Sequence, residues 1–259
     1  MPESLSKQEM SVTGCICEIF SGIQGEGLLV GERQIFVRFA GCNLDCAFCD
    51  TPSARTAANV GRVEQTTGAR DFLSVQNPLS ARDVLAYVER LETSPRIHRC
   101  VALTGGEPLV QAEFARGIAQ GLKKKGFTVL LETNGSLPDA LAEVISFVDI
   151  VSMDVKLPSA AKGPNLMAQH ELFLRRAVSA DVYVKVVVTC STSNDELLDA
   201  ARMVQAVDPA IPLVLQPVTR LRAILPPSGA QLLGWQAQCA SYLHKVRVIP
   251  QCHKIIGEL

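Results

Sequence analysis

Residues 39–51 read FAGCNLDCAFCDT, and they place Cys42, Cys46 and Cys49 in a C-x3-C-x2-C spacing directly after an apolar, strand-like run. Three thiolates on one short loop can bind three corners of a cubane [4Fe–4S] cluster, which leaves the fourth iron without a protein ligand. A structural zinc site differs, because it takes four protein ligands from two paired motifs. No second pair is present in this sequence, in which the other cysteines are isolated and His98 stands alone. An open metal position is the arrangement of an enzyme.

The other six cysteines are scattered, and their mostly apolar surroundings predict small buried hydrophobic residues. They are Cys15, Cys17, Cys100, Cys190, Cys239 and Cys252. Residues 1–10 carry charges of both signs and lack the apolar centre of a secretory signal. No apolar stretch approaches the roughly 18 to 20 residues that span a bilayer. We therefore expect a cytoplasmic protein with no membrane partner.

The composition suits a single domain that covers residues 1–259. Hydrophobic residues make up 47% of the chain, which is enough for a sizeable core. The 25 basic and 26 acidic residues give a formal net charge of −1. This balance provides no argument for a nucleic-acid partner or for an anionic membrane surface.

Short β-branched runs alternate with amphipathic segments of helical period along most of the chain. The predicted strands cover residues 34–39, 100–103, 128–131, 148–151, 182–188, 212–215 and 245–248. The predicted helices cover residues 81–91, 111–124, 137–146, 194–207 and 230–243. Such alternation is typical of an α/β fold with a parallel sheet, either open or barrel-like. Residues 52–80 do not join it, and we interpret them as a long, partly irregular loop insertion.

Three more polar motifs follow predicted strands, at the carboxyl ends where α/β folds bind their ligands. Residues 103–108 read LTGGEP, and the paired glycines let a charged ligand approach the backbone, although the same letters also describe a simple turn. In the motif LETNG, Glu132 is either a partner of a helix cap or a group that faces the substrate. In the motif SMDVK, Ser152, Asp154 and Lys156 are candidate cofactor ligands, with a surface ion pair as the alternative.

The cysteine spacing, with Phe48 just before the third cysteine, resembles the signature of the radical S-adenosylmethionine superfamily. In that superfamily the amino and carboxylate groups of S-adenosylmethionine chelate the open iron, and one electron from the cluster releases a 5′-deoxyadenosyl radical. The resemblance implies a partial, modified (β/α) barrel with the cluster at the carboxyl mouth of the strands. It also implies that TGGEP contacts the methionine amino group, and that SMDVK contacts the ribose and carboxylate of the cofactor.

A narrower resemblance begins upstream of the cysteine loop, where residues 18–27 read EIFSGIQGEG. The glycines around Gln24 and Glu26 let the backbone pack against a planar heterocycle, and the side chains offer hydrogen-bonding edges; taken alone, the segment is a turn. Together with CDT, TGGEP, ETNG, LQP and the C-terminal QCHK, it resembles the 7-carboxy-7-deazaguanine synthase family over about residues 18–259. Members convert 6-carboxy-5,6,7,8-tetrahydropterin into 7-carboxy-7-deazaguanine with loss of ammonia, in queuosine and deazapurine biosynthesis.

The resemblance to that family assigns roles to individual positions. The substrate-contacting positions correspond to Ile23, Gln24, Gly25, Arg38, Thr104, His253 and Leu259. The cofactor-contacting positions correspond to Gly106, Ser152, Lys156 and Gln216. The polar motifs add Glu132 to the substrate side and Asp154 to the cofactor side. Thr51 corresponds to the protein ligand of a bound Mg2+, and one hydroxyl with a substrate carboxylate suits that ion.

Some features depart from the family pattern or leave a role open. Residues 52–80 are longer than the family minimum, and the C-terminal KIIGEL lacks the aromatic and the proline or arginine of some members, which leaves the role of Leu259 open. The SMDVKLPS segment is longer than the SPK form, so the register of Lys156 is open as well. An unburied loop histidine would explain His253 almost as well as a substrate-side role.

Partners and rival functions follow from the same resemblances. The family implies flavodoxin or ferredoxin as the electron donor and a homodimer. A glycyl-radical-activating enzyme shares the cysteine loop, but the IQGEG and QCHK segments argue against it. A rival of another class is a non-catalytic iron–sulfur electron carrier or a zinc-stabilised binding module. A carrier normally needs four cysteine ligands for each cluster, whereas this loop supplies three.

Overall fold

Strands and helices alternate along the part of the chain that the computed structural model describes, residues 11–93 and 97–258. The strands are β1 (Thr13–Gly14), β2 (Ile16–Ile23), β3 (Arg33–Phe39), β4 (Val60–Glu64), β5 (Phe72–Gln76), β6 (Leu79–Ser80), β7 (Cys100–Gly105), β8 (Thr128–Thr133), β9 (Ile150–Val155), β10 (Asp181–Val188), β11 (Leu213–Pro217) and β12 (Val246–Val248). The helices are α1 (Ala81–Leu91), α2 (Ala112–Lys124), α3 (Pro138–Val144), α4 (Pro158–Ala161), α5 (Met167–Ala177), α6 (Asn194–Val207), α7 (Gly229–Ala240) and α8 (Cys252–Ile256).

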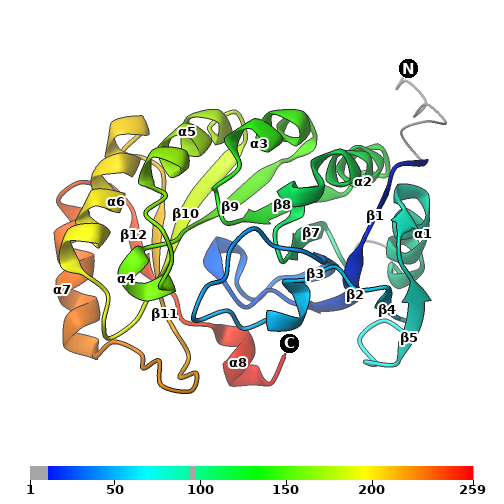
Figure 1. Cartoon of the computed structure of the whole chain (residues 1–259), viewed down its shortest axis with the longest axis horizontal. Helices are drawn as coiled ribbons and strands as arrows, with labels where there is room; N and C mark the ends of the chain where they lie inside the picture. Colours follow the sequence, from blue (N-terminus) through cyan, green and yellow to red (C-terminus); the bar gives the residue numbers. More distant parts are fainter. Residues whose placement is uncertain (1–10, 94–96, 259) are drawn as a thin grey trace.

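Ten of these strands form one sheet in the order β12-β11-β10-β9-β8-β7-β3-β2-β4-β5. The run from β12 to β3 is parallel throughout, whereas β2 is antiparallel to β3 and β5 is antiparallel to β4. In Figure 1 the larger helices follow one another along the outer side of the curved sheet, while α8 and the cysteine loop lie at the open inner side. The sheet is not closed, and this confirms the predicted partial (β/α) barrel.

Alternation along each strand separates the hydrophobic core from the inner side of the sheet. On β9, Val151, Met153 and Val155 belong to the main core, while Ser152 and Asp154 line an inner cavity. The strands of a parallel sheet are normally covered on both faces and are therefore apolar on both. The polar residues of this sheet therefore mark a face that is kept for ligands.

The seven predicted strands and five predicted helices are all present; α1 and α6 have the predicted ends, and each of the others has at least one shifted end. The largest shift is at β9, which was expected at residues 148–151 and runs from Ile150 to Val155. We expected the motif SMDVK at the end of this strand, but residues 152–155 belong to the strand, and Ser152 and Asp154 face the cavity from it. The elements that the sequence prediction missed include β2 and α5; α5 mixes polar and apolar residues in nearly equal numbers and buries only four of them.

Residues 52–80 are more regular than the expected insertion. They contain β4 and β5, which pair antiparallel and extend the sheet beyond β2, to which β4 is parallel. Both strands lie at or near an edge of the sheet and keep several polar, exposed residues, so their hydrophobic alternation is weak.

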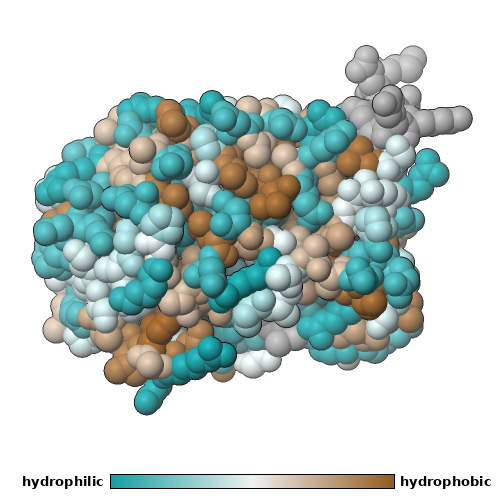
Figure 2. Space-filling model, in the orientation of Figure 1, coloured by the Kyte–Doolittle hydropathy of each residue, from teal (hydrophilic) through white to brown (hydrophobic). Residues whose placement is uncertain are grey.

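The surface in the view of Figure 2 mixes hydrophilic and hydrophobic residues, and the hydrophobic ones form several separate small groups. Within the described ranges, no helix combines the length and the apolar character that a bilayer crossing requires.

Candidate active site

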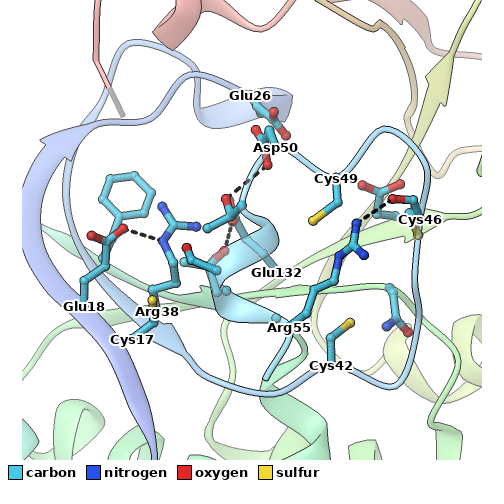
Figure 3. A pocket seen from close by; sticks show the side chains of 18 of the residues that line it. Cys17, Glu18, Glu26, Arg38, Cys42, Cys46, Cys49, Asp50, Arg55 and Glu132 are labelled. Carbon is cyan, nitrogen blue, oxygen red and sulfur yellow. Dashed lines mark hydrogen bonds and ion pairs between the residues drawn. The ribbon is translucent and has the colours of Figure 1, made fainter. Parts of the chain in front are cut away.

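A cavity of about 770 Å³ opens at the carboxyl ends of the parallel strands. Every predicted site residue in the described part of the chain lines it; Leu259 lies outside the described residues. The lining residues singled out from the sequence are Ile23, Gln24, Gly25, Arg38, Cys42, Cys46, Cys49, Thr51, Thr104, Gly106, Glu132, Ser152, Asp154, Lys156, Gln216 and His253. Figure 3 shows the three loop cysteines on one side of this space and Arg38 with Glu18 on the other.

The cysteine loop is fastened by backbone hydrogen bonds on both sides of its thiols. The amide of Cys42 donates to the carbonyl of Arg55 over 3.0 Å, and the amide of Ala47 donates to the carbonyl of Ala161 in α4 over 2.9 Å. Burial raises the pKa of the thiols of Cys42, Cys46 and Cys49, so iron must displace their protons on binding. Three half-buried thiols that face one cavity fit three corners of a [4Fe–4S] cluster.

A partly buried ring of side-chain hydrogen bonds ties this loop to the end of β8. The amide nitrogen of Asn134 donates to the side-chain oxygen of Asn43 over 2.9 Å, and Asn43 in turn donates to the Ser136 hydroxyl over 2.8 Å. The Ser136 hydroxyl closes the ring by donating to the Asn134 side chain. The position of Asn43, between the first two cysteines, makes this ring a support for the cluster loop.

The GGEP turn presents backbone to the cavity, not its carboxylate. Gly105 has φ of +121°, which favours glycine, and a Cβ on Gly106 would lie 2.1 Å from the carbonyl oxygen of Gly41. Glu107 is fully buried behind them and accepts from the amides of Leu109 and Asn134 over 3.1 and 2.7 Å. Burial outweighs these hydrogen bonds and raises the pKa of Glu107 to about 7. Glu107 therefore supports the backbone around the site through hydrogen bonds and does not face the cavity itself.

Two buried acceptors face the cavity on the side of β9 and β11. Asp154 Oδ1 and Gln216 Oε1 have no hydrogen-bond partner among the described residues, although both atoms are buried. Buried acceptors are normally paired, so a bound molecule with hydroxyl or amine donors fits them. The ribose and amino groups of S-adenosylmethionine are donors of this kind. Lys156 lies 2.9 Å from the other oxygen of Asp154 and 5.1 Å from the centroid of the Phe48 ring.

Polar side chains on the opposite side of the cavity converge on Glu132. Gln24 Nε2 donates to Glu132 Oε1 over 2.8 Å, and the Thr104 hydroxyl donates to Glu132 Oε2 over 2.6 Å. Glu132 is thus a cavity residue that accepts hydrogen bonds from Gln24 and Thr104, and it is not a helix-cap partner. Nearby, Glu18 Oε1 accepts from Arg38 Nε over 2.7 Å and fixes the direction of that guanidinium.

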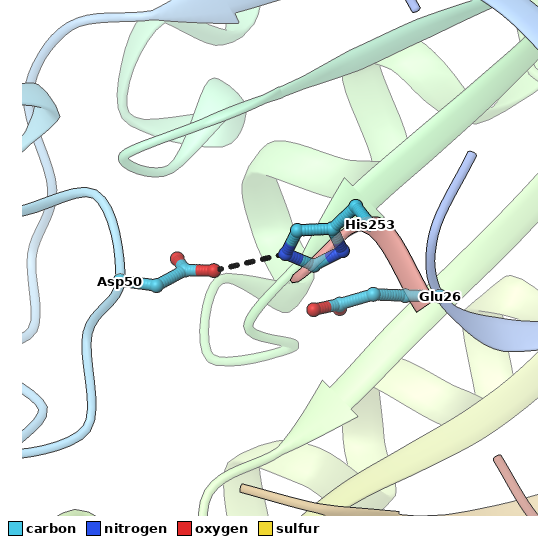
Figure 4. Close-up of side chains that lie close together, drawn as sticks. All are labelled: Glu26, Asp50 and His253. Atoms are coloured by element: carbon cyan, nitrogen blue, oxygen red, sulfur yellow. Dashed lines mark ion pairs between the residues drawn. The ribbon is translucent and has the colours of Figure 1, made fainter. Parts of the chain in front are cut away.

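Glu26, Asp50 and His253 bring three possible metal-ligand atoms within 4.8 Å of one another (Figure 4). Both carboxylates already have cationic or amide partners, because Lys185 pairs with Glu26 and Lys254 lies 3.7 Å from Asp50. Burial acts to raise the pKa of Asp50, but a hydrogen bond from His253 and the charges of Lys254 and Arg38 hold it well below its usual range. The charges of the two carboxylates in this group are therefore already compensated by Lys185 and Lys254.

No individual role was predicted for several charged or polar residues that line the cavity, among them Asp50, Lys185 and Gln251. Lys185 carries the clearest signal, since it interrupts the apolar strand DVYVKVVV, where a lysine is not expected unless it has a partner. Gln251 gives no comparable signal, because its partners Glu26 and Thr219 are far away in the sequence.

Comparisons with known proteins agree with this geometry. The model of the radical SAM superfamily matches residues 36–190. The 7-carboxy-7-deazaguanine synthase of Geobacter sulfurreducens is 42% identical over 243 residues, which cover 93% of this chain and 96% of that protein. The enzyme of the same name from Methanopyrus kandleri is 38% identical over 244 residues, which cover 93% of this chain and 92% of that protein.

Among solved structures, the crystal structure of QueE from Escherichia coli matches 96% of this chain and 100% of its own, with a TM-score of 0.64. At 21% identity this likeness is one of fold. The match to the family model and the identities with the two synthases show that the similarity is also one of sequence. The chain therefore belongs to the radical SAM superfamily and, within it, to the family of 7-carboxy-7-deazaguanine synthases.

Proposed function

We propose that the protein is a ring-contracting lyase that converts 6-carboxy-5,6,7,8-tetrahydropterin into 7-carboxy-7-deazaguanine with loss of ammonia. The observation that carries this proposal is one continuous cavity with three cysteine thiols on one side and the Gln24, Thr104 and Glu132 cluster on the other. Relatives that carry this enzyme name and match over nine-tenths of the chain support it.

The cofactor side would hold a [4Fe–4S] cluster and S-adenosylmethionine, which together supply a 5′-deoxyadenosyl radical when bound. Cys42, Cys46 and Cys49 ligate the cluster in this proposal. The backbone at Gly106 receives the methionine moiety, and the unpaired oxygens of Asp154 and Gln216 accept hydrogen bonds from hydroxyl or amine groups. Ser152 and Lys156 line the same side and complete the set.

The substrate side would hold the pterin ring through its hydrogen-bonding edge. Glu132 is an acceptor for ring and amine N–H groups, and Gln24 offers both a donor and an acceptor. The close approach of Gly25 to His253, where a Cβ would lie 2.3 Å from the ring nitrogen, leaves flat backbone for stacking. Ile23, Thr104 and His253 complete the proposed contacts. Arg38, oriented by Glu18, pairs with the substrate carboxylate.

We also propose a Mg2+ ion at Thr51, shared with the substrate carboxylate. The Thr51 hydroxyl lies beside Asp50 and donates to its Oδ1 over 3.1 Å, so a hard oxygen ligand and a negative charge are adjacent. A flavodoxin or ferredoxin as electron donor, a homodimer, a cytoplasmic location and a single domain over residues 1–259 belong to the same proposal.

The test is an anaerobic incubation of the reconstituted protein with S-adenosylmethionine, dithionite, Mg2+ and the tetrahydropterin, followed by mass spectrometry. The proposal expects a product with the mass of 7-carboxy-7-deazaguanine, and slower turnover when Mg2+ is removed. Cleavage of S-adenosylmethionine without consumption of the pterin would refute the substrate assignment and leave the radical chemistry intact. A search for a glycyl radical on protein substrates would then follow.

A further inference from the structure

Four alternating charges form a line across the inner face of the sheet. Lys185 on β10 pairs with Glu26 of the loop after β2, and its Nζ lies 3.2 Å from Asp154 Oδ2 on β9. Asp154 Oδ2 also lies 2.9 Å from Lys156 Nζ, just beyond the end of β9. The line thus leads from the IQGEG segment to the residue that packs on the cysteine loop.

Lys185 is the inner member that contacts carboxylates on both sides. Its side chain is 11% exposed and faces the cavity, while Val184 and Val186 point into the hydrophobic core. Burial acts to lower the pKa of Lys185, but Glu26, Asp154 and Glu132 together raise it well above its ordinary value. The ammonium is therefore a fixed cation, and its contribution is structural charge, not proton transfer.

The two carboxylates differ in how much they depend on this ammonium. Without Lys185, Asp154 would keep its contact with Lys156. Among the described residues, the hydrogen-bond partner left to the Glu26 side chain would be the amide of Gln251, which donates over 3.0 Å, and Glu26 would still face Asp50. Removing one partner of a buried ion pair leaves an uncompensated charge, and this is more harmful than removing both partners.

We infer that Lys185 is a positioning residue whose ammonium compensates the charges of Glu26 and Asp154, so that without it the uncompensated charge of Glu26 would disturb both the substrate side and the cofactor side of the cavity. The inference rests on the proposed function, because that function defines the two sides. It assigns a role to a residue that does not belong to any of the motifs from which the family was inferred. Lys185 acts through its two carboxylate partners.

Binding of S-adenosylmethionine to the cluster-loaded protein tests this inference, read from the change in the cluster's electron paramagnetic resonance spectrum. We expect Lys185→Met to weaken binding roughly tenfold, because Glu26 and Asp154 lose their shared cation. Glu26→Gln alone should change affinity by less than about threefold, since Lys185 and Lys156 still flank Asp154. Lys185→Met combined with Glu26→Gln should recover most of the loss, and Lys185→Arg should retain most of the affinity.

Lys123→Met is the matched control, because it removes a lysine from a surface ion pair with Asp149 and should leave binding unchanged. Unchanged affinity in Lys185→Met would overturn the inference. Equal losses of affinity in Lys185→Met and in the double variant would also overturn it. That result is expected if the Lys185 side chain only fills space. If Lys185→Met does not fold, the comparison of Glu26→Gln with the double variant decides: similar affinities support the inference, and a tenfold loss in the double variant overturns it.

Binding of the tetrahydropterin to the wild-type protein is measured in parallel. A protein that binds S-adenosylmethionine but not the pterin would refute the proposed substrate. The variant series with S-adenosylmethionine would still decide the role of Lys185, so the two failures are distinguishable.

Discussion

The two sides of the cavity are built in different ways. On the cofactor side, the cysteine loop and the GGEP turn are held mainly by backbone hydrogen bonds and by the neutral ring of Asn43, Asn134 and Ser136. On the substrate side, side chains from distant parts of the chain are held by ion pairs, as in Arg38 with Glu18 and Lys185 with Glu26.

This difference has a consequence for mutation. Hydrogen-bonded backbone keeps its conformation when a single side chain is replaced, so changes in the cysteine loop and the GGEP turn should act through the replaced ligand itself. Ion pairs in a partly dry cavity depend on both partners, so a change on the substrate side should also disturb the neighbour that loses its partner. Variants on either side can test this contrast.

The largest expected effect is the loss of any one of the loop cysteines. We expect Cys42→Ala, Cys46→Ala and Cys49→Ala each to lose the stable cluster and with it all cleavage of S-adenosylmethionine, because two thiolates cannot hold a cubane at three corners. Iron and sulfide analysis and the yield of 5′-deoxyadenosine measure this. Cys190→Ala is the control, since Cys190 is exposed and is not among the residues that line the cavity. Normal cleavage in any of the three variants would contradict the cluster assignment.

Arg38→Ala should have the next largest effect, and on the substrate side only. Loss of a charge-assisted pair is worth about 1.5–3 kcal/mol, so the affinity for the tetrahydropterin should fall by roughly tenfold to a hundredfold. The cluster spectrum should not change, because the cysteine loop does not depend on Arg38. Fluorescence or equilibrium dialysis measures the affinity.

Arg62→Ala is the matched control for that experiment. Arg62 also pairs with Glu18, over 2.6 Å, but its side chain is 48% exposed, against 13% for Arg38. Its loss should reduce pterin affinity by less than about threefold. An equal effect of the two variants would indicate that Glu18, and not a direct contact from Arg38, governs binding.

The same contrast explains what could be predicted from the sequence. The residues of the cofactor side belong to short motifs, so the cysteine spacing predicted that Cys42, Cys46 and Cys49 lie together, and the predicted strand ends placed Ser152 and Asp154 at the same cavity, which all five residues line. The parallel sheet followed from alternating periodicities for the same local reason. These predictions needed no knowledge of which distant segments meet.

The substrate side depends on contacts that no local pattern specifies. Gln251 and Glu26 are separated by 225 positions, and only the folded sheet brings α8 back onto the IQGEG loop. Lys185 was assigned to a strand, but its partners were not predictable, because the order of strands in the sheet decides which carboxylates it meets. The edge strands β4 and β5 were missed for a different reason, namely the weak alternation of exposed strands.

The smallest effect on ligand binding is expected at Glu107, which supports the cofactor side from behind. Its pKa is raised from 4.5 to about 7 in the folded chain, so the folded state keeps a proton that the unfolded state has released between these values. Stability should therefore fall as the pH rises from 4.5 through about 7, by at most about 1.4 kcal/mol per pH unit from this one group. Glu107→Gln should remove that slope and change the affinity for S-adenosylmethionine by less than about threefold.

Thermal unfolding of the apoprotein across this range, compared between wild type and Glu107→Gln, measures the slope. Identical pH profiles would mean that Glu107 is already ionised when folded, and that the amides of Leu109 and Asn134 stabilise its charge more than burial opposes it. A large loss of S-adenosylmethionine affinity would be a different contradiction. It would mean that a change at Glu107, behind the cofactor side, disturbs the neighbouring residues that bind S-adenosylmethionine. Such indirect effects are expected of the ion-paired substrate side.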